Sequence, residues 1–308
     1  MDVKRILCPT DFSEASAHAA EQAIVMAGYY DSRITALHVL APMMAAAVPA
    51  LSEADGRSIE EVELERCRDH VARWFAMATS AGVPVDVAVE IGEPRKRILA
   101  RAAMLPADLI VMGTHGTGGF ERLLLGSVTE RVLRKVACPV LTVPPHAHAT
   151  SQVPFKRILC AVDFSDSSLA GVRCAASLAL RSGAALTLVH VLEWPWEEPP
   201  PPMLEELPYE QGFALSEFRR YCETSAQKRL ESVMPDSAGL RAATAVRSGK
   251  PYVQILQLAA EEQSDLIVIG VRGRNPMDLT LFGSTTNHVV RRASCAVLTM
   301  RQFARKRG

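Results

Sequence analysis

Short apolar runs alternate with longer amphipathic segments along this chain of 308 residues. In the first half the apolar runs are VKRILC, RITALHVL, VPVDVAVEI, DLIVMG and CPVLTV, and turn residues bound each of them. Runs this short and this rich in β-branched residues predict five strands. The segments between them predict helices at 14–29, 54–81, 94–104 and 127–136.

The second half of the chain repeats the first. The segment KRILCPTDFSEAS at 4–16 recurs as KRILCAVDFSDSS at 156–168, an offset of 152. Glycines further along recur at an offset of 157, so the second half carries five extra residues. The repeated helices are predicted at 166–182, 209–233, 250–263 and 284–293.

Both halves carry the pattern of a doubly wound fold. The runs LIVMG and LIVIG are continuously apolar, as expected of parallel strands that helices cover on both faces. We therefore predict an α/β protein of two tandem Rossmann-like domains, each a five-stranded parallel sheet flanked by four helices. Their expected bounds are 1–146, called the first copy below, and 154–304, called the second copy.

Prolines mark the two irregular segments of this plan. The run at 194–208 accounts for the extra residues and predicts a surface loop, either an inert spacer or a flap over a pocket. The linker at 144–154 contains His146 and His148. Two histidines alone favour a solvated linker over a metal site.

Composition and charge narrow the classes of partner. The chain has 34 Lys or Arg and 34 Asp or Glu, so no positive excess would attract nucleic acid, and none is expected as a partner. No apolar run approaches a membrane span, and the first residues do not resemble a signal peptide, so neither a membrane partner nor export is expected. Seven cysteines without a C-x-x-C pair favour a reducing, cytoplasmic location and buried thiols, with a redox role as the alternative.

A glycine motif follows the fourth predicted strand of each copy. Its spacing is G-x2-G-x9-G-S, starting at Gly113 and again at Gly270. Such glycines permit positive φ or close approach of the backbone to a ligand, and the final Gly-Ser opens a helix whose N–H groups favour an anion. The motif therefore predicts a phosphate site. The alternative is that the glycines only turn the chain and that Ser127 and Glu130 form a capping box.

These paired motifs, together with PTDFS and AVDFS after the first strands and the strands LHVL and VHVL, resemble the universal stress protein family. The resemblance covers nearly the whole chain and is to the tandem type of its nucleotide-binding branch. It implies ATP as the cofactor, with or without Mg²⁺. Adenosine would lie near the ends of the first two strands, and the phosphates would lie on the glycine loop and the last helix.

The resemblance assigns binding residues by position in each copy. On the adenosine side they are Pro9, Thr10, Asp11 and Val39, then Ala161, Val162, Asp163 and Val191. On the phosphate side of the first copy they are Met112, Gly113, His115, Gly116, Gly126, Ser127, Val128 and Thr129. In the second copy they are Ile269, Gly270, Arg272, Gly273, Gly283, Ser284, Thr285 and Thr286.

Some of these assignments have alternatives. A carboxylate at a strand end suits ribose hydroxyls, but Asp11 and Asp163 are also placed to cap the following helix. His38 and His190 recur inside strands and are interpreted as satisfied core residues rather than as site residues.

Charge differs between the two predicted sites. Arg272 replaces His115, Arg274 replaces Thr117 and Asn287 replaces Glu130, which gives the second site more positive charge for a triphosphate. We therefore expect tighter binding in the second copy, although Pro276 alters its loop.

The chain lacks the apparatus of an ATP-dependent enzyme. No G-x4-G-K-[ST], H-E-x-x-H, C-x-x-C or G-x-S-x-G motif occurs, and no catalytic residue is assigned. The sequence thus favours a regulatory ATP-binding protein of the stress response. The alternatives are a slow Mg-dependent ATPase, with Asp11 or Asp163 helping to hold the ion, and a scaffold with empty sites.

The resemblance also bears on assembly. It implies contact through the last strands, CPVLTV at 138–143 and CAVLTM at 295–300, which would pair inside one chain as a pseudo-dimer and hide two edges. A further homodimer of whole chains is also implied. The protein partner is not predicted.

Overall fold

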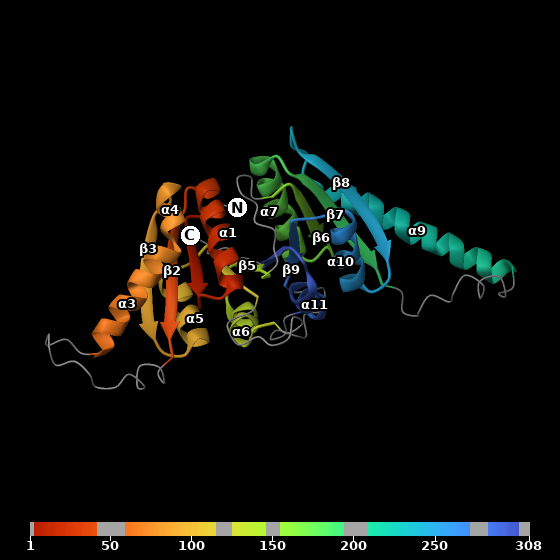
Figure 1. The fold of residues 1–308 in the computed structure, drawn as a ribbon. Helices are drawn as coiled ribbons and strands as arrows, with labels where there is room; N and C mark the ends of the chain where they lie inside the picture. Colours follow the sequence, from red (N-terminus) through yellow and green to blue (C-terminus); the bar gives the residue numbers. More distant parts are fainter. Residues whose placement is uncertain are drawn as a thin grey trace.

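The computed structural model describes residues 3–41, 59–114, 125–145, 155–193, 209–271 and 283–301. Strands and helices alternate through both copies, which lie side by side in Figure 1. The elements of the first copy are β1 (Arg5–Thr10), α1 (Glu14–Tyr30), β2 (Arg33–Leu40), α3 (Ile59–Trp74), α4 (Ala76–Ser80), β3 (Val85–Ile91), α5 (Pro94–Met104), β4 (Leu109–Gly113), α6 (Ser127–Lys135) and β5 (Val140–Val143). Those of the second copy are β6 (Arg157–Ala161), α7 (Asp166–Ser182), β7 (Ala185–Leu192), α9 (Tyr209–Val233), β8 (Arg241–Ser248), α10 (Pro251–Glu261), β9 (Leu266–Gly270), α11 (Ser284–Arg292) and β10 (Ala296–Met300).

One ten-stranded sheet runs through both copies, in the order β3-β2-β1-β4-β5-β10-β9-β6-β7-β8. Pairing within each copy is parallel, so the predicted fold class is confirmed. The order reverses between β1 and β4, and between β6 and β9, because the chain winds first to one side of the central strand and then to the other. These reversal points are where ligands of such sheets bind.

The two copies join through their last strands. β5 and β10 are antiparallel, with Leu141 opposite Leu298. The hydroxyl of Thr142 donates to the carbonyl of Val297 at 3.2 Å, and that of Thr299 donates to the carbonyl of Val140 at 3.1 Å. Such reciprocal bonds are typical of a two-fold pairing. The pairing of CPVLTV with CAVLTM is thus confirmed, and neither strand is an edge of the sheet.

Helices cover both faces of the sheet, as the apolar strands require. One hydrophobic cluster joins Ile6 and Cys8 to α1, α3, α7 and α9, and the other joins Leu7 to α5, α6, α10 and α11. Successive residues of β1 therefore point into opposite cores. Both clusters continue from one copy into the other.

The helix predicted at 54–81 is divided. In its described part α3 ends at Trp74, and α4 begins at Ala76. The amide of Ala78 donates to the carbonyl of Phe75 at 2.9 Å, a tighter turn than the α-helical spacing. This turn brings Phe75 into the core with Val71 and Ala78. Residues 54–58, the proline-rich segment 194–208, and the linker residues His146 and His148 lie outside the described residues.

Five of the seven cysteines are buried, and none forms a disulfide. Burial raises the pKa of Cys8, Cys138, Cys174 and Cys295 to about 12, and it also raises the pKa of Cys160. Thiols in this state are poor nucleophiles and act as small core side chains, as predicted for them.

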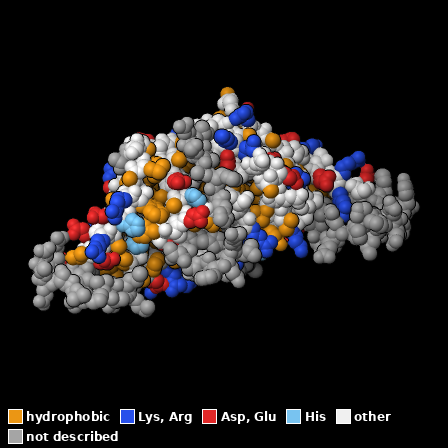
Figure 2. Space-filling view, in the orientation of Figure 1, with side chains coloured by type: hydrophobic (Ala, Val, Ile, Leu, Met, Phe, Trp, Pro, Cys, Tyr) orange, Lys and Arg blue, Asp and Glu red, His pale blue; other side chains and the backbone are white. Residues whose placement is uncertain are grey.

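The described surface mixes charges of both signs. Lys and Arg side chains lie among Asp and Glu on the face seen in Figure 2. In the part of the chain that the structure describes, no helix is both long and apolar enough to cross a membrane.

Candidate functional site

The loop after the first strand has the same hydrogen bonds in both copies. The Asp11 carboxylate accepts from the Ser13 amide at 3.1 Å and from the Ser13 hydroxyl at 2.6 Å. Asp163 accepts from Ser165 at 3.0 and 2.6 Å. Each serine, rather than the aspartate, is the N-cap of the helix that follows. The aspartates therefore orient the caps, and an ionised carboxylate retains further lone pairs for a ligand.

A phenylalanine in each loop has a left-handed backbone. Phe12 has φ 62° and Phe164 has φ 63°, a conformation that costs energy for a residue with a Cβ. Because the same strained residue lies at the same strand end in both copies, this loop is a candidate functional loop. Sequence analysis missed these two residues, and the shared triplet DFS was the available signal.

The strand histidines support these loops. The Nδ1 atom of His38 lies 2.9 Å from the carbonyl of Thr10, and that of His190 lies 2.6 Å from the carbonyl of Val162. Their rings pack against the loop phenylalanines, with centroids 4.6 and 4.7 Å apart. Each histidine thus has a hydrogen-bond partner within the fold, as predicted, but both are half-buried rather than part of the core.

The environment of the loop phenylalanine differs between copies. The ring of Phe12 stacks on His70 at 4.0 Å and meets Trp74 edge-on at 5.3 Å, both from α3. The ring of Phe164 instead lies 4.0 Å from the guanidinium of Arg229, from α9. The first loop is thus enclosed by aromatic rings, and the second faces a cation.

The glycines that end β4 and β9 serve helix packing. A Cβ on Gly113 would lie 2.9 Å from the carbonyl carbon of Ala15, and one on Gly270 would lie 2.7 Å from the Ser167 hydroxyl. Neither glycine has positive φ. They therefore let the first turns of α1 and α7 contact the strand ends, a packing role that the sequence pattern did not predict.

The helices α6 and α11 begin without a side-chain cap among the described residues. Their N-caps are Gly126 and Gly283, whose amides donate to the carbonyls of Thr114 and Val271 at 2.8 and 3.1 Å. The first turn of each helix is thereby fixed to the end of its strand. The predicted alternative of a capping box between Ser127 and Glu130 is wrong, because the N-cap is Gly126 and no side chain caps α6.

The first turns of α6 and α11 each contain a buried threonine and an exposed serine. The hydroxyls of Thr129 and Thr286 are buried and donate to the carbonyls of Gly113 and Gly270 at 2.9 and 2.7 Å. These hydroxyl bonds fix each helix to its strand. The backbone N–H groups of the first helical turn have no partner within the helix and can therefore bind an anion. Ser127 and its counterpart Ser284 are exposed.

The sheet brings most of the assigned residues to one edge in each copy. β1 is flanked by β2 and β4, with Thr10 level with His38, so the carboxyl ends of these strands meet. Pro9, Thr10, Met112, Ala161, Val162 and Ile269 are buried there. Val39, Gly113, Val128, Asp163, Val191, Gly270 and Thr285 are half-buried. Asp11 is exposed, and His115, Gly116, Arg272, Gly273, Arg274 and Pro276 lie outside the described residues.

The described side chains form no candidate metal centre. Within the described ranges, no three His, Cys, Asp or Glu side chains are grouped as metal ligands. The chemistry that the described site offers is therefore hydrogen bonding from backbone N–H groups and hydroxyls, with a carboxylate beside them.

Comparison with known proteins identifies the family. The profile of the Universal stress protein family matches residues 2–144 and again 154–301. This chain belongs to the universal stress protein family. Both copies are thus universal stress protein domains in tandem.

Individual relatives agree with this assignment. Universal stress protein MJ0531 of Methanocaldococcus jannaschii is 39% identical over 140 residues, which cover 46% of this chain and 81% of the relative. A universal stress protein of Mycolicibacterium smegmatis is 27% identical over 310 aligned positions and 96% of each chain. The crystal structure of a universal stress protein from Archaeoglobus fulgidus has a TM-score of 0.67 at 23% identity, covering 98% of this chain and 100% of that one, and so shares the fold.

Proposed function

We propose that this universal stress protein binds an adenine nucleotide, ATP in particular, at the carboxyl edge of each copy, and that occupancy regulates its interactions in the stress response. The observation that carries the proposal is the pair of helix starts at Ser127 and Ser284. Each is exposed, has no side-chain cap among the described residues and is fixed at a point where strand order reverses. An anion is the natural partner of such N–H groups.

The adenosine part of the ligand belongs at the neighbouring loop. Asp11 and Asp163 sit at the ends of the central strands, where an ionised carboxylate suits ribose hydroxyls. Val39 and Val191 follow the histidines that support these loops, and they offer apolar contacts for a base. Any Mg²⁺ would be held mainly by the nucleotide phosphates, since the described residues form no metal cluster. The seven cysteines, none in a disulfide, fit a cytoplasmic location.

The first experiment measures the nucleotide that the protein carries. Purified, desalted protein is denatured, and the released adenine nucleotide is quantified per chain by chromatography. One to two nucleotides per chain are expected. If the sites empty during purification, added ATP at 100 times its dissociation constant should stabilise the fold by about 2.7 kcal/mol. AMP, cAMP and GTP serve as competing ligands.

A substitution at each helix start tests the location of the site. Ser127→Asp and Ser284→Asp place a carboxylate at the first helical residue, where it favours the helix dipole but repels a phosphate. We expect each variant to keep the stability of the parent and to lose ATP binding in its own copy. Ser225→Asp, an exposed change on α9, carries the same charge and should leave binding intact.

Three results would replace the proposal. An ADP-rich load with Mg-dependent release of phosphate would favour the slow ATPase. The absence of nucleotide, with a melting temperature that ATP does not change, would favour a scaffold. Binding that both aspartate variants retain would place the nucleotide elsewhere.

A further inference from the structure

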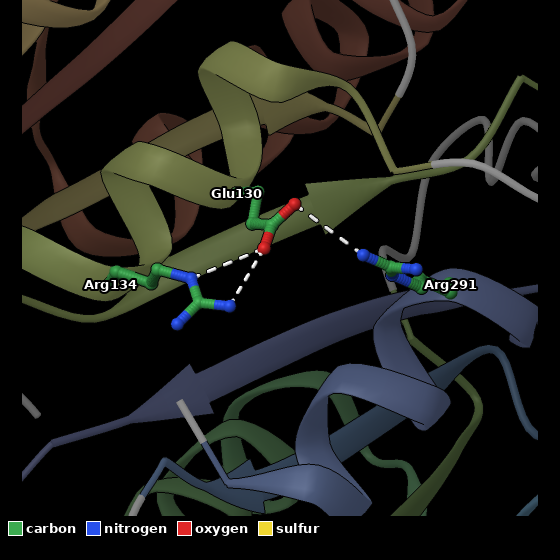
Figure 3. A network of polar contacts seen from close by, with 3 residues as sticks. All are labelled: Glu130, Arg134 and Arg291. Carbon is green, nitrogen blue, oxygen red and sulfur yellow. Dashed lines mark hydrogen bonds and ion pairs between the residues drawn. The ribbon is translucent and has the colours of Figure 1, made fainter. Parts of the chain in front are cut away.

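Three charged side chains join the copies beside the proposed phosphate sites. Glu130 of α6 accepts from Arg134 of the same helix, at 3.2 Å from Nε and 2.8 Å from Nη2. Its other carboxylate oxygen lies 3.4 Å from Nη2 of Arg291, which belongs to α11 of the second copy. Figure 3 shows the carboxylate between the two guanidinium groups. All three side chains are about two-thirds to three-quarters shielded, which strengthens their interaction relative to an open surface pair.

Glu130 stands where its charge matters for an anion. It lies three residues after Ser127, which is about 4.5 Å along the helix axis and within the first turn. A carboxylate in that turn interacts favourably with the same N–H groups that the proposed phosphate needs. Unless it is neutralised, Glu130 therefore opposes a negatively charged ligand in the first copy.

The network is not symmetric, although the copies are. Arg134 corresponds to Arg291 at the offset of 157, and Glu130 corresponds to Asn287. One carboxylate is thus shared by equivalent arginines from both copies. The Nε atom of Arg291 and the Oδ1 atom of Asn287 are buried and have no hydrogen-bond partner among the described residues. The described contact of the Arg291 guanidinium is the one to Glu130.

We propose that Arg291 of the second copy is a positioning residue for the anion site of the first copy. Its guanidinium draws the Glu130 carboxylate toward α11 and offsets its charge, so that the first site reaches full affinity for phosphate only with the second copy in place. This inference rests on the proposed function and adds a direction to it. The second copy supports binding in the first. The reverse does not hold, because Asn287, at the position equivalent to Glu130, carries no charge that the first copy would have to offset.

The test uses ligands of different charge. In the Ser284→Asp background, which leaves the first site to be measured, calorimetry gives the affinities of ATP, AMP and adenosine. We expect Arg291→Met to lower the affinity for ATP on the order of three- to tenfold. The affinity for AMP should fall less, and the affinity for adenosine should stay within about 1.5-fold of the parental value. Arg292→Met is the matched control, because it removes the same charge from the next residue of α11, whose guanidinium lies over Tyr252. It should leave all three affinities within about 1.5-fold.

A rescue separates charge from structure. Glu130→Gln removes the opposing charge, so the double variant Glu130→Gln with Arg291→Met should recover parental ATP affinity or exceed it. Equal weakening of ATP and adenosine by Arg291→Met, or no rescue by Glu130→Gln, would overturn the inference while the proposed function stands. If the parent protein binds no ATP at all, the proposed function fails and this inference fails with it.

Discussion

The two copies keep one backbone geometry and surround it with different side chains. In both, the loop after the first strand carries a phenylalanine with φ near 62° and an aspartate bonded to the serine cap. The neighbours of these loops are His70 and Trp74 in the first copy and Arg229 in the second. The same short-range hydrogen bonds therefore accompany the same loop backbone in both copies, whereas the side chains packed around the loop differ.

A second contrast lies between the helix pairs α5–α6 and α10–α11, which cover the face of the sheet that α1, α3, α7 and α9 do not cover. In the first copy α5 and α6 border a cleft lined by Leu99 and by the stems of the charged residues Glu93, Arg95, Lys96, Arg131 and Lys135. In the second copy the equivalent helices are closed by Tyr252, which stacks on His288 at 4.3 Å and lies 5.4 Å from the Arg292 guanidinium. Aromatic packing thus takes the place of exposed charge between the same pair of helices.

The largest expected difference concerns the strand-end glycines. Gly113→Ala should destabilise the fold by about 1 to 3 kcal/mol, because its Cβ would meet the backbone of Ala15. Gly270→Ala should cost somewhat less, because its shortest contact is the Ser167 hydroxyl and its nearest backbone atom, the Ser168 nitrogen, lies at 3.0 Å rather than 2.9 Å. Urea unfolding measures both. Gly28→Ala is the control, since nothing lies within 4 Å of its Cβ, and equal effects at all three positions would contradict the packing role.

The next difference is in nucleotide affinity. The second site lacks the Glu130 charge and should bind ATP more tightly, by up to about tenfold, which corresponds to about 1.4 kcal/mol. Ser284→Asp should therefore reduce the ATP-induced rise in melting temperature more than Ser127→Asp at low ATP. The reverse ranking would show that elements outside these helix starts set the affinities.

A smaller difference is expected between the helix pairs. Tyr252→Ala should destabilise the protein by roughly 1 kcal/mol through loss of the ring stack. Arg95→Ala at the equivalent position should change stability by less than about 0.5 kcal/mol, because its partner Glu93 also pairs with Lys96. Thermal unfolding of the two variants decides whether the aromatic pair stabilises the second copy.

The smallest contrast is expected for the buried thiols. Cys8 and Cys160 are equivalent, as are Cys138 and Cys295, and burial raises the pKa of all four. At pH 8 a thiol reagent should label the half-buried Cys67 and Cys222 before the buried five, which should react only after unfolding. Because their folded pKa exceeds the unfolded value of about 8.5, these thiols contribute stability that is complete below that pH and is lost as pH rises toward 12. Rapid labelling of Cys8 but not Cys160 would break the equivalence of the copies.

Sequence patterns predicted the fold well because hydrophobic periodicity decides it. The alternation of runs located the strands, whereas the β5–β10 pairing was expected from the resemblance to the universal stress protein family and not from periodicity. Contacts between distant segments were not predictable in this way. The need for Gly113 arises from α1 packing against β4, and the partner of Glu130 lies 161 residues away on α11. The left-handed Phe12 was missed because propensity disfavours it and the surrounding loop imposes it.

Because β5 and β10 belong to one chain, their antiparallel pairing does not weaken when the protein is diluted. Two separate chains that meet through such strands come apart as their concentration falls, whereas strands tethered in one polypeptide face each other at a high effective concentration that dilution does not change. The ratio of the two partners is likewise fixed at one to one by the covalent link. Each half can therefore accumulate substitutions that a pair of identical subunits would have to carry twice, and Glu130 opposite Arg291 is such an arrangement.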